Sequence, residues 1–208
     1  DITTAKGRDQ RAVLFAKWNS FSRITVEGHL DAESVNILID ADASSRIVRG
    51  GGDSSHHTDM SRRVSALAYH IRPNADVLVI GAGGGDDVIA ARMFRARKVS
   101  AVEVNPIIAL DVMRSEPFRS YSGGIYESTG VELHVDDGRS FIRRSHEKYG
   151  IIQATLVDTW AATGAGAFAL TENYLYTVEA FEDFLGHLDN DGILTMTRWY
   201  FEPPDQML

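Results

Sequence analysis

The chain has 208 residues, of which 44% are hydrophobic and 24% charged, an ordinary composition for a globular protein with a substantial core. Its formal net charge of −8 argues against a nucleic-acid partner, because phosphate binding needs a basic surface. Without cysteine the chain has no disulfide, thiolate nucleophile or cysteine-ligated metal, and it has no apolar run of about 18 residues that would span a membrane.

The sequence of residues 1–56 predicts a lead-in, meaning an N-terminal segment without clear secondary structure, followed by a small β-hairpin element. Residues 1–17 carry little pattern and are interpreted as the lead-in. β-Branched residues then cluster over 21–26 and 35–39, which is typical of an antiparallel hairpin, and a third short strand is expected near 46–48.

Residues 57–208 predict a doubly wound α/β domain. From Asp76 onward, continuous apolar strands alternate with helical patterns, which indicates a mostly parallel sheet covered on both faces. The expected strands are 76–81, 98–104, 131–136, 153–158 and 192–199. The expected helices are 58–70, 86–95, 106–115, 138–147 and 172–188, the last with Thr171 as its N-cap and a turn at 189–191 after it. Ligands of such sheets bind at the carboxyl ends of the strands.

A glycine-rich turn follows the first of these strands. Gly81, Gly83 and Gly85 form a Gly-x-Gly-x-Gly pattern with Gly84 at its second variable position, and Asp86 stands where a dinucleotide-binding turn would have its last glycine. The helix that follows begins with two aspartates. Their negative charges complement the helix dipole but would repel a diphosphate, so a nucleoside is the better ligand. The alternative is that the glycines only allow the helix to pack closely on the strand.

Acidic residues follow the next three expected strands. Glu103 can accept hydrogen bonds from two ribose hydroxyls, and the pair Asp137 and Gly138 and then Asp158 occupy corresponding positions. Each has an ordinary alternative: Glu103 caps the next helix, Asp137 is an N-cap, and Asp158 is a turn residue. Their occurrence at successive strand ends favours a nucleoside site.

These residues, together with the segment 170–176, resemble the spermidine synthase family. Its members are aminopropyltransferases on the class I S-adenosylmethionine-dependent methyltransferase fold, and the resemblance extends over 18–199. It implies that the glycine turn and Glu103 hold the methionine part and the ribose of the donor, and that Asp137 contacts the adenine amine. Asp158 would match the catalytic aspartate that helps to remove a proton from the attacking amine.

The chain also departs from the family pattern. The family has an aspartate at the position of Gly84, where it holds the amine of decarboxylated S-adenosylmethionine. We expect Gly84 to leave backbone N–H groups free for a carboxylate, and Asp86 and Asp87 to face elsewhere. A second family aspartate, which grips the substrate amine, is replaced by Ala161, and a tyrosine–glutamine pair by Phe21–Ser22. Transfer to putrescine is therefore in doubt.

The acceptor side of the site is less defined. Trp160 begins a glycine- and alanine-rich loop that is either a lid over the substrate or an ordinary surface loop. Tyr174 and Tyr176 either line the acceptor pocket or contribute to the core. No metal site is expected.

The function expected from the sequence is a spermidine-synthase-like transferase. Its co-substrate would be S-adenosylmethionine or decarboxylated S-adenosylmethionine, and its acceptor a small molecule such as an amine. The alternatives are a methyltransferase with a non-polyamine acceptor and an inactive nucleoside-binding module of a larger protein. We expect this segment to be cytoplasmic without membrane contact, to lack the final strands of the fold and to be part of a longer protein. Membrane attachment of the parent protein and a homodimer stay open.

Overall fold

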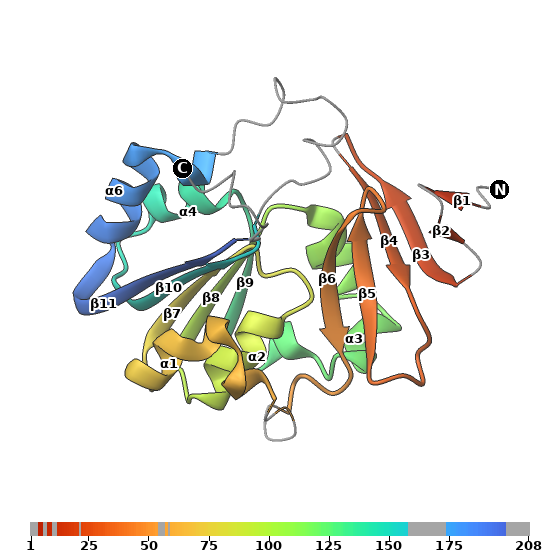
Figure 1. The fold of residues 1–208 in the computed structure, drawn as a ribbon, viewed down its shortest axis with the longest axis horizontal. Helices are drawn as coiled ribbons and strands as arrows, with labels where there is room; N and C mark the ends of the chain where they lie inside the picture. The colour runs from red at the N-terminus through yellow and green to blue at the C-terminus, as the bar shows by residue number, and fades with distance from the viewer. Residues whose placement is uncertain are drawn as a thin grey trace, which may run out of the picture.

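The computed structural model describes residues 4–5, 8–9, 12–20, 22–53, 57, 59–157 and 174–198. They form an antiparallel sheet and a parallel sheet that lie side by side, with a short ribbon of β1 (Thr4–Ala5) and β2 (Arg8–Asp9) near the N-terminus (Figure 1). This arrangement confirms the α/β class predicted from the sequence.

The antiparallel sheet has four strands rather than the expected three. Its order along the sheet follows the chain: β3 (Val13–Trp18), β4 (Arg23–Glu27), β5 (Ser34–Ile39) and β6 (Ala43–Val48). Residues 13–18 therefore form a strand and not a lead-in. The sequence signal was weak because β3 lies at the sheet edge and most of its side chains are exposed or half-buried.

The parallel sheet has the strand order β11-β10-β7-β8-β9. Its strands are β7 (Asp76–Ile80), β8 (Lys98–Glu103), β9 (Val131–Val135), β10 (Tyr149–Thr155) and β11 (Leu188–Thr197). From β7 the chain builds outward in one direction through β8 and β9, and later returns to add β10 and β11 on the other side. The end of β7 beside β10 is therefore the switch point at which ligands of open α/β sheets bind.

Helices cover both faces of the parallel sheet, as expected for a doubly wound fold. In Figure 1, α1 (Leu67–Ile71) and α2 (Asp86–Met93) lie below the sheet, and α4 (Gly138–Arg144) and α6 (Val178–Gly186) lie above it. The connections also contain α3 (Phe118–Tyr121), the π-helix η4 (Ile107–Val112) and the 3₁₀ turns η2 (Met60–Arg62), η3 (Val64–Ala66), η5 (Ile125–Glu127) and η6 (Tyr174–Tyr176).

Several expected helix boundaries were wrong. The helix over 58–70 is two 3₁₀ turns and one short α-helix, because Arg63 has an extended backbone with ψ of 150° that interrupts the helical hydrogen bonds. The final helix begins after Thr177, whose side-chain oxygen accepts from the N–H of Ala180, and the expected cap Thr171 lies outside the described residues.

The last two strands begin earlier than the pattern predicted. Tyr149 already pairs with Leu188, and the next pair is Ile151 with Ile193, so the expected turn at 189–191 is an irregularity inside a strand. The strand at 149–155 also ends before Asp158. The apolar run of the sequence placed the strand's end too late because Leu156, although its N–H still donates to Thr197 of β11, has a φ of 52° and so leaves the extended conformation.

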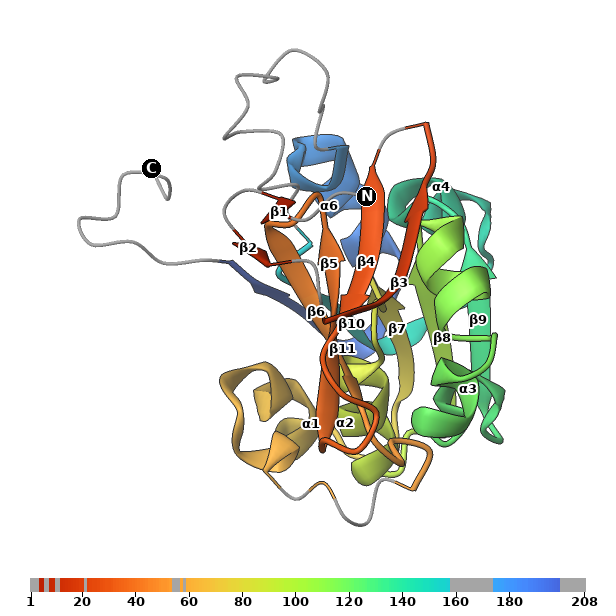
Figure 2. The same cartoon turned by 90° about the vertical axis from the view of Figure 1, so that its right-hand side faces the viewer.

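The antiparallel sheet packs against the helical layer below the parallel sheet. One hydrophobic cluster joins Ile24, Ile37 and Ile47 of the antiparallel sheet to Val77 of β7 and Phe118 of α3. Figure 2, turned by 90°, shows the antiparallel sheet in front of the ends of the parallel strands. β6 thereby reaches the glycine turn. A division near residue 57 remains a prediction. None of the described helices is both long and apolar enough to cross a membrane.

Candidate functional site

The glycine turn connects β7 to α2 at the switch point of the sheet. Gly81, Gly83 and Gly85 have φ values of 72°, 50° and 98°, a conformation that other residues rarely adopt. Gly84 is required for another reason: a Cβ at this position would lie 2.0 Å from the carbonyl oxygen of Arg46 on β6. The turn is therefore pressed closely against the antiparallel sheet.

The N–H groups of the turn are already used. Gly83 donates to Oε2 of Glu103 at 2.9 Å, and Gly84 donates to Oγ of Ser45 at 2.8 Å. The expectation that Gly84 leaves a free N–H for a carboxylate was therefore wrong. The reason is the approach of β6, which the sequence does not reveal.

Glu103 is buried at the end of β8, with 6% of its surface exposed. Its other oxygen, Oε1, accepts from the N–H of Asn105 at 2.8 Å. Burial raises the pKa of Glu103, and the N–H groups of Asn105, Gly83 and Val104 oppose that rise. Since each carboxylate oxygen can accept more than one hydrogen bond, Glu103 holds the turn and retains capacity for ligand hydroxyls.

Tyr126 supports the turn and was missed by sequence reasoning. Its hydroxyl, buried on η5, lies 2.8 Å from the carbonyl oxygen of Ala82 and 2.9 Å from that of Gly83. Burial and the nearby carboxylate of Glu103 raise its pKa well above the usual value, so it stays protonated and donates. A lone tyrosine between two strands gives no sequence signal for this role.

Asp137 and Gly138 follow β9 and begin α4. Oδ1 of Asp137 accepts from the N–H of Ser140 at 2.8 Å, so the N-cap alternative is correct, and the other oxygen can still accept from a ligand. A Cβ on Gly138 would lie 2.5 Å from the side chain of Ile80, which shows that this glycine permits α4 to pack on β7. Asp136 instead pairs with Arg144.

Asp86 and Asp87 begin α2 and differ in their surroundings. Asp86 pairs with Arg63 at 2.7 Å and with Arg46 at 3.2 Å. Asp87 contacts the side chains of Thr155 and Gln153 at the end of β10, whereas the sequence led us to expect both aspartates to face elsewhere. Burial raises the pKa of Asp87 to about 6, and these two hydrogen bonds limit the rise.

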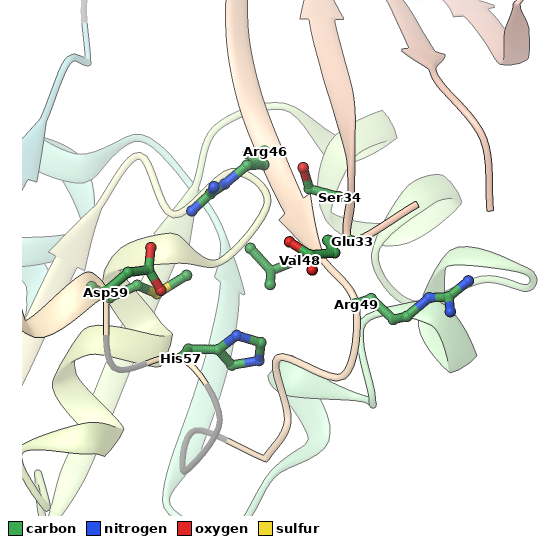
Figure 3. Close-up of a pocket in the computed structure, with 8 residues that line it drawn as sticks. Glu33, Ser34, Arg46, Val48, Arg49, His57 and Asp59 are labelled. Carbon is green, nitrogen blue, oxygen red and sulfur yellow. The ribbon is translucent and has the colours of Figure 1, made fainter. Parts of the chain in front are cut away.

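A separate pocket of about 350 Å³ lies between the antiparallel sheet and η2. Figure 3 shows its lining: Glu33, Ser34, Arg46, Val48, Arg49, His57, Asp59 and Met60. The side chains of Arg46 and Arg49 extend in opposite directions, and Arg46 reaches Asp86. None of the site residues predicted from the sequence lines this pocket.

Comparison with known proteins agrees with the resemblance. No family model matches the chain. A polyamine aminopropyltransferase of Sulfolobus acidocaldarius is 23% identical over 134 residues, which are 64% of this chain and 41% of that protein. One of Buchnera aphidicola is 27% identical over 128 residues, 60% of this chain and 40% of that protein. The chain is thus similar in sequence to polyamine aminopropyltransferases.

Solved structures of spermidine synthases share the fold. The Thermotoga maritima enzyme superposes with a TM-score of 0.60 at 16% identity, over 89% of this chain and 56% of that one. A spermidine synthase in complex with the transition-state analogue AdoDATO gives 0.59 at 17% identity, with the same coverage. The alignments with the two curated aminopropyltransferases span only about two fifths of those proteins.

Gly84 is the clearest departure from the aminopropyltransferase pattern. Because its Cβ position is filled by the backbone of β6, the aspartate of the family pattern cannot be accommodated here without moving that strand. The lack of a carboxylate at this position is thus part of how the two sheets fit together.

The residues expected to act on the acceptor are only partly described. Asp158 and Trp160 lie outside the described residues, as does the side chain of Tyr174. The ring of Tyr176 lies under the guanidinium of Arg198, whose central carbon is 4.3 Å from the ring centre. Tyr176 on η6 therefore lies beside the carboxyl end of β11, the edge strand next to β10.

Proposed function

We propose that the chain is a spermidine-synthase-like transferase. It would bind S-adenosylmethionine or its decarboxylated form and transfer an aminopropyl or methyl group to a small nucleophilic acceptor. The single observation that supports this best is the hydrogen bond from Gly83 to Glu103, because it joins the glycine turn and a buried acceptor into one site. The relationship to the aminopropyltransferases supports the same conclusion.

The chemistry would consist of one substitution. The lone pair of the acceptor attacks a carbon attached to the sulfonium sulfur, and a new bond forms as the carbon–sulfur bond breaks. The electron pair of that bond stays on sulfur, which leaves as a neutral thioether. A base takes the proton lost by the acceptor, and Asp158 is the candidate. The protein contributes mainly by holding the two reactants in line.

Two donors fit this proposal: S-adenosylmethionine for methyl transfer and its decarboxylated form for aminopropyl transfer. The structure removes one argument for ordinary S-adenosylmethionine, since the N–H of Gly84 already has a partner. It keeps the other, since no carboxylate at Gly84 repels the methionine carboxylate. A methyltransferase and an aminopropyltransferase are therefore both compatible with the glycine turn, and the acceptor residues do not separate them.

Calorimetry with S-adenosylmethionine, its decarboxylated form and methylthioadenosine tests the proposal. The intact protein should bind at least one of them. Glu103→Gln should weaken this binding, whereas Glu132→Gln, at an exposed position of β9, should not. Asp158→Asn should spare binding and abolish transfer. If the intact protein binds none of the three ligands, the proposal of a nucleoside site is wrong. If the wild type binds a donor but catalyses no measurable transfer, the inactive-module alternative is favoured, and if Asp158→Asn leaves a measurable turnover unchanged, Asp158 is not the base.

A further inference from the structure

Asp87 lies in the first turn of α2, where the ends of β7 and β10 meet. We propose that Asp87 binds the positively charged amine group of the donor, in place of the carboxylate that Gly84 excludes. This inference rests on the nucleoside site proposed above, and it assigns the specificity for the charged end of the donor to a residue outside the glycine turn.

The order of the strands places Asp87 at the correct end of the ligand. Along the sheet edge, Asp137 follows β9, Glu103 ends β8, and β7 and β10 come next. Neighbouring strands are about 4.8 Å apart, so the distance from β8 to β10 is about 10 Å. A donor with its adenine at Asp137 and its ribose at Glu103 therefore extends its remaining chain toward Asp87.

The surroundings of Asp87 offer hydrogen-bond acceptors for an ammonium group. Gln153 is 1% exposed, its Nε2 donates to Oγ1 of Thr155 at 3.0 Å, and both side chains bond to the carboxylate of Asp87. Oε1 of Gln153 is buried and has no hydrogen-bond partner among the described residues. Buried acceptors without partners are costly, and an ammonium group supplies three donors.

The local charges point to Asp87 rather than to its neighbour. Asp86 is neutralised by Arg63 and Arg46, whereas Asp87 forms no ion pair within the part of the chain that the structure describes. Asp87 is half-buried. Its negative charge is therefore available to a cation.

The raised pKa of Asp87 makes this role measurable as a pH dependence of ligand affinity. Burial raises its pKa to about 6, the charge of Asp86 raises it further, and that of Arg63 lowers it. Tyr69 on α1 and Tyr126 on η5 also feel its charge, and both stay neutral because their pKa values are raised well above 10. Affinity for an amine-bearing ligand should rise as the pH increases through about 6, because only the ionised carboxylate attracts the amine.

Two neutral thioethers isolate the amine. Decarboxylated S-adenosylhomocysteine carries it, and methylthioadenosine lacks it, while neither has a sulfonium charge. Calorimetry on the whole chain at about pH 8 should show that Asp87→Asn lowers the affinity for the amine-bearing ligand about 10- to 100-fold. The affinity for methylthioadenosine should change less than about twofold. The control Asp76→Asn, in an ion pair with Arg97 on the far end of β7, should change neither.

Each result decides the question. Equal affinities of wild type and Asp87→Asn for the amine-bearing ligand overturn the inference, as does an equal loss for both ligands, which marks a structural role. Binding of neither ligand by the wild type removes the proposed function and this inference with it. Should Asp87→Asn fail to fold, the wild type alone tests the inference. Its affinity for the amine-bearing ligand divided by its affinity for methylthioadenosine should increase at least about fivefold from pH 5 to pH 8. A ratio that does not change with pH contradicts the role of Asp87.

Discussion

The backbone N–H of Gly83 donates a hydrogen bond to the buried carboxylate of Glu103 at 2.9 Å. This contact ties the turn after β7 to the end of β8, and it holds the carboxylate in place before any ligand arrives. A preorganised acceptor loses less freedom on binding than a mobile one. The same hydrogen bond that stabilises the turn would thus prepare the ribose site.

Gly84→Ala should destabilise the protein. The added Cβ would meet the carbonyl oxygen of Arg46 at 2.0 Å, and because this contact is with backbone, the two sheets must separate locally. We expect a loss of about 2 to 4 kcal/mol in the free energy of unfolding, measured by urea denaturation. Gly186→Ala is the matched control, since its Cβ would meet nothing within 4 Å. Equal stability of the two variants would show that β6 does not lie against the turn.

Tyr126→Phe should weaken both stability and ligand binding. It leaves the buried carbonyl groups of Ala82 and Gly83 without their hydroxyl donor, at a cost of about 1 to 3 kcal/mol. Tyr121→Phe provides the comparison, because that hydroxyl donates to Ala32, away from the turn, and its loss should reduce stability alone. Thermal unfolding and calorimetry on both variants separate the two effects. Unchanged ligand affinity in Tyr126→Phe would contradict a supporting role at the site.

Asp137→Asn should separate capping from binding. Asparagine is as good an N-cap as aspartate, so the free energy of unfolding should change by less than about 0.5 kcal/mol. Its amide oxygen would serve the N–H of Ser140, which leaves only an NH₂ group toward the adenine amine. Affinity for adenosine ligands should therefore fall about tenfold, whereas Asp136→Asn, which removes the partner of Arg144, should retain it. If both variants bind normally, Asp137 is only a cap.

The stability gained by Asp87→Asn should depend on pH. A carboxyl group whose pKa is raised in the folded state stabilises the protein only when protonated, so its contribution is lost as the pH rises from about 4 through about 6. The free energy of unfolding of the variant minus that of wild type should increase over this range and level off near pH 7, by roughly 3 kcal/mol. Denaturation curves at several pH values measure this difference. A difference that is flat or decreases with pH would show that Asp87 is not buried in the folded protein.

The sequence by itself determined the alternation of strands and helices, and it placed the glycine turn, Glu103 and Asp137 directly after three of the parallel strands. Continuous apolar runs such as residues 77–80 can only be buried, and glycine at positions of positive φ is a local requirement, so both are visible in one dimension. Glu103 and Asp137 were found for the same reason: they stand directly after such runs.

Only the tertiary structure decided which groups meet across the turn. Ser45 and Arg46 reach Gly84 from a different sheet, Tyr126 reaches the turn from η5, and Gln153 places its amide beside Asp87. These contacts depend on packing between elements far apart in the chain, which no local pattern encodes. For that reason the sequence could indicate a nucleoside site, while the carboxylate beside β10 emerged only when the strands were set in order.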